Sequence, residues 1–76
     1  MDRIRRSNIE KLVEALQSLK EDLETIKDEE EEAMDNTPEG LQESERYQAM
    51  EEAFSNLEYA FDGLEEVIDY LTEAAS

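Results

Sequence analysis

The residues that could carry chemistry in this sequence are almost all carboxylic acids. It contains 23 Asp and Glu, 7 Lys and Arg, no Cys and no His. The densest acidic run is residues 28–32, Asp-Glu-Glu-Glu-Glu. Hard cations need oxygen ligands that converge from a turn, whereas consecutive helical residues point in different directions around the axis. We therefore expect this run to be a solvated helix end and not a metal site.

Paired carboxylates can also act as a general acid and a general base. Without His or Cys, however, the sequence lacks the ligands of zinc sites and the Glu-x-x-His motifs of di-iron bundles. The apolar residues follow helical stripes and give no sign of a pocket. We expect no enzymatic activity, no cofactor and no metal.

The net charge of −16 limits the classes of partner. Phosphate contacts need Lys and Arg, so we expect no direct binding to nucleic acid or to anionic membranes. No apolar run approaches the roughly 20 residues of a membrane span. The basic N-terminus is not followed by the apolar segment of a signal peptide. We expect a soluble cytoplasmic protein that contacts other proteins.

Two apolar stripes, each stepping by three and four residues, predict two helices. The first stripe is Ile9, Leu12, Leu16, Leu19, Leu23, Ile26, Glu30 and Ala33, and the second is Tyr47, Met50, Phe54, Leu57, Phe61, Leu64, Ile68, Leu71 and Ala75. The prediction is a single all-α domain, an antiparallel coiled-coil-like hairpin.

The boundaries follow from capping residues. Ser7 and Glu10 form a capping box that would start the first helix, and a start one turn earlier at Asp2 is the alternative. Residues 35–40 contain the only Pro, which cannot lie inside a continuous helix. We expect helices at about residues 7–35 and 44–75, with a turn at about 36–43. Ser44 is the favoured N-cap of the second helix, and Thr37 is the competing one.

Folding the chain back about Gly40 brings the two stripes face to face. Leu19 then faces Phe61, and Leu23 faces Leu57. We favour this register because starting the second helix at Pro38 would bring Gly40 into the seam between the helices.

A two-helix seam is shallow, and a chain of this size is marginal without disulfides, a metal or a partner. We expect an antiparallel homodimer that forms a four-helix bundle, with a different protein partner or a marginal monomer as the alternatives. Its interface is predicted on the flank that carries the small residues of the second helix. The predicted interface residues are Val13, Leu16, Lys20, Ala53, Ala60, Leu64, Val67 and Ala74.

Two further surfaces lie off the stripes. Tyr59 and Tyr70 flank Gly63, and exposed aromatic side chains beside a glycine are a possible partner surface, although scattered surface Tyr residues are also ordinary. The three arginines within residues 3–6 are expected beside the C-terminal end of the second helix, whose negative dipole end they would complement.

The acidity also permits mimicry of DNA. A dimer would carry twice the charge of −16 along a rod of about 45 Å, estimated from roughly 30 helical residues. That is about one charge per 1.4 Å, comparable to about one per 1.7 Å in B-DNA. An inhibitor of the anti-restriction or anti-CRISPR type is therefore an alternative function.

The sequence resembles a group of short acidic uncharacterised proteins found in bacterial genomes, prophages and other mobile elements. The resemblance covers about residues 9–71, and its most distinctive part is the Pro-Glu-x-Leu-Gln-x-Ser-Glu-Arg segment of residues 38–46. The other similar segments are residues 28–33, 50–53, 56–58 and 68–71. The resemblance implies a helical hairpin but no activity and no functional residues.

Overall fold

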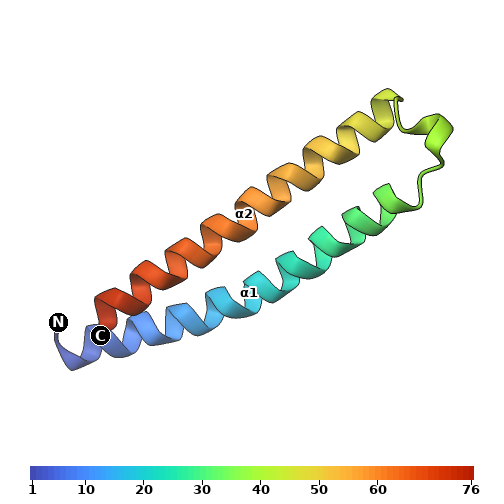
Figure 1. Ribbon diagram of the computed structural model, residues 1–76. Helices are drawn as coiled ribbons and strands as arrows, with labels where there is room; N and C mark the ends of the chain where they lie inside the picture. The colour runs from blue at the N-terminus through green and yellow to red at the C-terminus, as the bar shows by residue number, and fades with distance from the viewer.

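Two long helices run antiparallel and pack against each other in the computed structural model, which describes all residues 1–76 (Figure 1). Helix α1 spans Arg3–Asp35, the 3₁₀ turn η1 spans Glu39–Leu41, and helix α2 spans Glu45–Ala75. The hairpin is a rod of 59 × 15 × 13 Å, with both chain ends at the same end. The predicted all-α hairpin is confirmed.

Helix α1 begins at the earlier of the two expected positions. Asp2 is its N-cap, and its carboxylate accepts a hydrogen bond from the Arg5 backbone N–H at 2.8 Å. This bond satisfies one of the amides that the first helical turn leaves free. Ser7 therefore lies inside the helix, and the Ser7–Glu10 pattern does not mark its start.

The connection between the helices is held by local hydrogen bonds. The Thr37 hydroxyl donates to the Ala33 carbonyl at 3.0 Å, and Pro38 then takes an extended conformation that ends the helical path. Ser44 is the N-cap of α2, as predicted, because its Oγ accepts from the Tyr47 N–H at 3.2 Å. The same Oγ donates to the Leu41 carbonyl at 2.6 Å and so ties η1 to α2.

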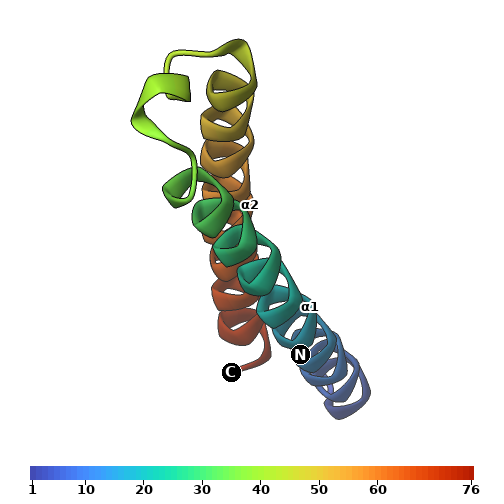
Figure 2. The same ribbon diagram turned by 90° about the vertical axis from the view of Figure 1, so that its right-hand side faces the viewer.

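The face of α2 that packs on α1 is the predicted stripe. Its members are half-buried, and Ile68, with 6% of its surface exposed, is the one residue that is shielded almost completely. Seen from the loop end, the two helices cross obliquely (Figure 2), as interdigitating side-chain ridges require. The core is therefore a single thin layer between two helices.

The face of α1 that packs on α2 differs from the predicted one. Leu12, Leu19 and Ile26 were expected in the seam but are 49%, 57% and 52% exposed. In the seam, every second residue of the predicted α1 stripe gives way to the residue that follows it in the sequence. Helix α1 is therefore rotated about its axis relative to the predicted orientation. The half-buried residues of α1 that face α2 are Ile9, Val13, Leu16, Lys20, Leu23, Lys27, Glu30 and Met34.

The two seam lysines give a physical reason for this rotation. Lys20 and Lys27 place their Nζ atoms 5.0 and 5.1 Å from the centre of the Phe61 ring, within reach of a cation–π attraction. The Lys20 Nζ also lies 2.9 Å from the Glu65 Oε1. Their hydrocarbon stems cover the seam while their charges reach water and the carboxylate, so lysine serves as a seam residue here.

The register differs from the prediction as well. Because Phe61 lies between Lys20 and Lys27, it is level with Leu23, and the predicted pairing of Leu19 with Phe61 is wrong. The displacement is roughly one helical turn. Its cause lies in the connection, where Thr37 and Tyr47 line the same groove. The chain thus continues alongside α2 beyond the end of α1 and reverses only around η1.

Candidate interaction surface

One flank of the seam is polar. Glu10 of α1 and Thr72 of α2 line the same open groove beside Ile9 and Ala75, so these two positions lie on one side of the hairpin. Equivalent positions one or more heptads away lie on the same side of each helix. Together with Glu10 and Thr72 they form the polar flank, which also contains Gln17, Glu24, Glu31, Glu51, Glu58 and Glu65.

The opposite flank is apolar. Ala33 of α1 and Arg46 of α2 line a common groove at the loop end, and these residues belong to the rows on the far side of the seam from Glu10 and Thr72. Between the arginines that end them, Arg5 in α1 and Arg46 in α2, the two rows continue in heptad steps with apolar residues alone. We call this surface the apolar flank; it comprises Leu12, Leu19, Ile26 and Ala33 of α1 and Ala53, Ala60, Val67 and Ala74 of α2.

All residues of the apolar flank are exposed, and Val67 is 47% exposed. Large apolar side chains that line up on one side of a small protein are unusual, since single scattered ones are the norm. The hairpin therefore leaves uncovered a continuous strip along both helices, with no charge between Leu12 and Ala33 in its α1 row or between Ala53 and Ala74 in its α2 row.

The predicted dimer-interface residues divide between two places. Ala53, Ala60, Val67 and Ala74 lie on the apolar flank. The other four lie half-buried between α1 and α2: Val13, Leu16, Lys20 and Leu64.

Sequence reasoning placed Leu12, Leu19 and Ile26 in the seam and so missed them as flank residues. The signal that could have found them was the width of the α1 stripe. Val13 follows Leu12, and the same position one and two heptads later holds Lys20 and Lys27, whose hydrocarbon stems can also pack, so three places per heptad and not two could face a neighbour. A stripe of that width can be shared between two neighbours.

The predicted partner surface on α2 is open. Tyr59 and Tyr70 are 75% and 70% exposed. A methyl group added at Gly63 would meet no atom within 4 Å, so nothing in the hairpin requires a glycine there. These three residues form no enclosed site.

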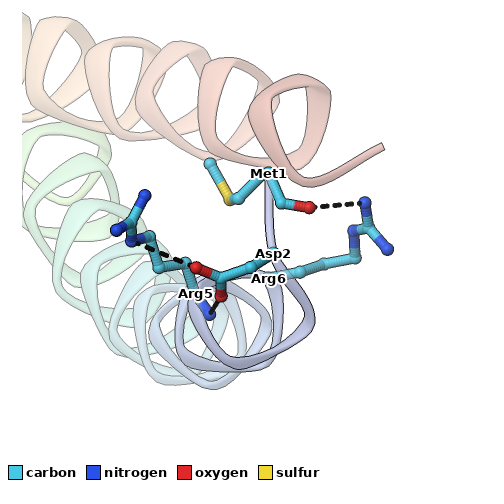
Figure 3. Close-up of polar contacts among 4 residues, drawn as sticks. All are labelled: Met1, Asp2, Arg5 and Arg6. Carbon is cyan, nitrogen blue, oxygen red and sulfur yellow. Dashed lines mark hydrogen bonds and ion pairs between the residues drawn. The ribbon is translucent and has the colours of Figure 1, made fainter.

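The basic residues at the start of α1 are bound locally. Arg5 pairs with Asp2 at 3.5 Å, and the Arg6 guanidinium donates to the Met1 carbonyl at 3.2 Å (Figure 3). The Arg6 Nε is shielded but has no hydrogen-bond partner. Neither arginine forms an ion pair with α2, but the start of α1 lies at the same end of the hairpin as the C-terminal end of α2.

The acidic run lies at the C-terminal end of α1, where only Glu30 is half-buried and the other four carboxylates are exposed. No group of three or more Asp or Glu side chains has a geometry that could hold a metal ion. Neither helix combines the length and the apolar character needed to cross a membrane.

Comparison with models of known protein families, with curated proteins and with solved structures found no match to this chain. Function is therefore inferred from the two flanks.

Proposed function

We propose that this chain is a non-enzymatic interaction protein whose first partner is a second copy of itself. The observation that carries the proposal is the apolar flank, a charge-free strip on a molecule of net charge −16. In the proposed homodimer, two hairpins place these flanks face to face and form a four-helix bundle. The polar flank and the outer faces then remain available to other protein partners.

The need for a partner follows from the thin core. Only Ile68 is buried, and even it keeps 6% of its surface exposed, whereas a stable small domain without disulfides or metal usually needs further burial. Complete burial of a Leu or Ile is worth about 1.5–3 kcal/mol, so each half-exposed side chain of the flank gains about 1 kcal/mol when it is covered.

The size of the hairpin matches a second copy. One whole side of the hairpin measures 59 by 15 Å between Cα atoms, about 900 Å², so the roughly 800 Å² that each partner contributes to a standard stable interface requires contact along nearly the full length of the rod. The strong negative charge disfavours contacts between copies that bring carboxylates together. The apolar flank is the surface that avoids such contacts.

Sedimentation equilibrium at micromolar concentration tests the proposal. The unmodified chain should be a dimer, and Leu19→Glu should be monomeric because it buries an unpaired charge in the interface. The matched control is Gln17→Glu, which adds the same charge on the polar flank and should remain dimeric. A stable, fully helical monomer of the unmodified chain would contradict the proposed bundle.

A second candidate function is the occupation of a basic nucleic-acid site on another protein. It is favoured by the unpaired state of the carboxylates, since only Asp2 and Glu65 form ion pairs. Over the 59 Å length, two side-by-side copies would present about one charge per 1.8 Å, close to about 1.7 Å in B-DNA.

Salt-dependent capture separates the two functions. The immobilised chain should retain a basic nucleic-acid-binding protein from lysate and release it at about 0.5 M NaCl. The eluted protein should then lose its duplex DNA when the free chain is added at low salt. Retention that is insensitive to salt, or no competition with DNA, would count against mimicry.

A further inference from the structure

Charge is distributed unevenly along the rod. The loop half, residues 21–63, contains 16 acids and two bases, a net charge of −14. The terminal half, residues 1–20 and 64–76, contains seven acids and five bases, a net charge of −2. Lys20 marks the division, because its partners Phe61 and Glu65 place it level with this part of α2. The hairpin thus has one strongly acidic end and one nearly neutral end.

Two arrangements can bring two apolar flanks together by a two-fold axis. In the first, both loops lie at the same end, and α1 of one copy lies over α2 of the other. In the second, the loops lie at opposite ends, α1 lies over α1 and α2 lies over α2. Packing allows both, because the leucine row fits over alanines in the first, and the alanine rows let the α2 helices approach closely in the second.

We propose that the second copy docks with its loop at the opposite end, so that the acidic end of each hairpin lies over the nearly neutral end of the other. This inference rests on the proposed homodimer and adds its orientation. Packed helices lie about 8–10 Å apart, comparable to the Debye length of about 8 Å at physiological salt. Charges that the interface brings together therefore still repel, whereas charges at opposite ends of a 59 Å rod are screened from one another.

The terminal end is suited to receive an acidic neighbour. Of its arginines, Arg5 has a carboxylate partner in Asp2, while Arg3 has none and Arg6 donates only to a backbone carbonyl. Arg5 also lies one heptad before Leu12, at the end of the same row. In the dimer with loops at opposite ends, the Arg5 guanidinium lies over the loop half of the partner. Each end of the dimer then contains the loop half of one copy and the terminal half of the other.

Spin-label distances in the full-length chain test the orientation. The chain has no Cys, so a single label can be attached to Leu41→Cys in the loop or to Gln17→Cys on the polar flank near the middle of the rod. The two Leu41 labels should lie nearly one rod length apart, approaching 59 Å. Loops at the same end would instead bring these labels within about two helix diameters, roughly 20–25 Å.

The Gln17 label is the matched control. Its two copies should lie within roughly three helix diameters, about 35 Å, in either arrangement, so it reports the dimer itself. A Gln17 distance in this range with a short Leu41 distance would overturn the proposed orientation and leave the homodimer intact. Loss of coupling at Gln17 together with a monomeric sedimentation profile would overturn the homodimer and the orientation with it.

Discussion

Ser44 shows how one side chain can define the start of a helix. Its hydroxyl oxygen accepts from the Tyr47 N–H and donates to the Leu41 carbonyl, so it joins the last residue of η1 to the first turn of α2. Asp2 caps α1 through a carboxylate but has no comparable link to a preceding turn. Capping at Ser44 thus fixes both a helix end and the shape of the connection.

Replacing Ser44 with Ala should lower the free energy of unfolding by about 1 kcal/mol, because the Tyr47 amide loses its acceptor. Urea denaturation followed by circular dichroism measures the change. Ser55→Ala is the control, since Ser55 is exposed inside α2 and caps nothing; it should change the free energy by less than about 0.5 kcal/mol. Equal effects of the two substitutions would contradict the capping role.

At the scale of the elements, the two helices use their stripes differently. Helix α2 turns its large apolar stripe toward α1 and keeps its alanines on the apolar flank. Helix α1 turns Lys20 and Lys27 toward α2 and leaves Leu12, Leu19 and Ile26 outside. Helix α1 thereby uses two amphipathic side chains in the seam and leaves three fully apolar ones exposed on the apolar flank.

The seam role of lysine predicts a difference between two chemically identical substitutions. Lys20→Ala should lower the free energy of unfolding by about 1 kcal/mol, because it removes the stem packing, the Phe61 contact and the pair with Glu65. Lys11→Ala changes the net charge equally, but Lys11 is exposed and makes no such contacts. Its effect in the same urea titration should stay below about 0.5 kcal/mol. Similar losses in both variants would place Lys20 outside the seam.

For the whole molecule, self-repulsion opposes folding. The 23 acids far outnumber the 7 bases, and only two ion pairs form. Net charge of this size destabilises a compact state, because folding brings like charges closer together. The loop half, with a net charge of −14, carries most of this repulsion.

The melting temperature should therefore rise as NaCl increases from about 0.05 to about 0.5 M, because added ions screen the carboxylates. Thermal denaturation followed by circular dichroism measures it. In a triple variant, Glu29→Gln, Glu31→Gln and Glu32→Gln, the low-salt melting temperature should be higher and the rise with salt smaller. A melting temperature that falls with salt would show that attractive pairs outweigh the repulsion.

The sequence by itself determined the two helices, the turn between them, the Ser44 cap and the face that α2 turns inward. These features depend on contacts within a few residues or on the size of side chains, since the third apolar position per heptad of α2 holds mostly alanine, which is smaller than the Phe and Leu of the stripe. Even there, the choice between Asp2 and Ser7 as the start of α1 stayed open, because both residues are good N-caps and the structure had to select one.

Only the tertiary structure decided the rotation of α1 and the register. The α1 stripe is three positions wide, so Leu19 and Lys20 were both compatible with the seam, and hydrophobicity alone favoured the leucine. Lysine took the place because its stem packs on Phe61 while its charge reaches Glu65, and this pairing exists only once α2 lies alongside. The leucine row was thereby turned onto the apolar flank, where it forms the surface proposed to bind a second copy.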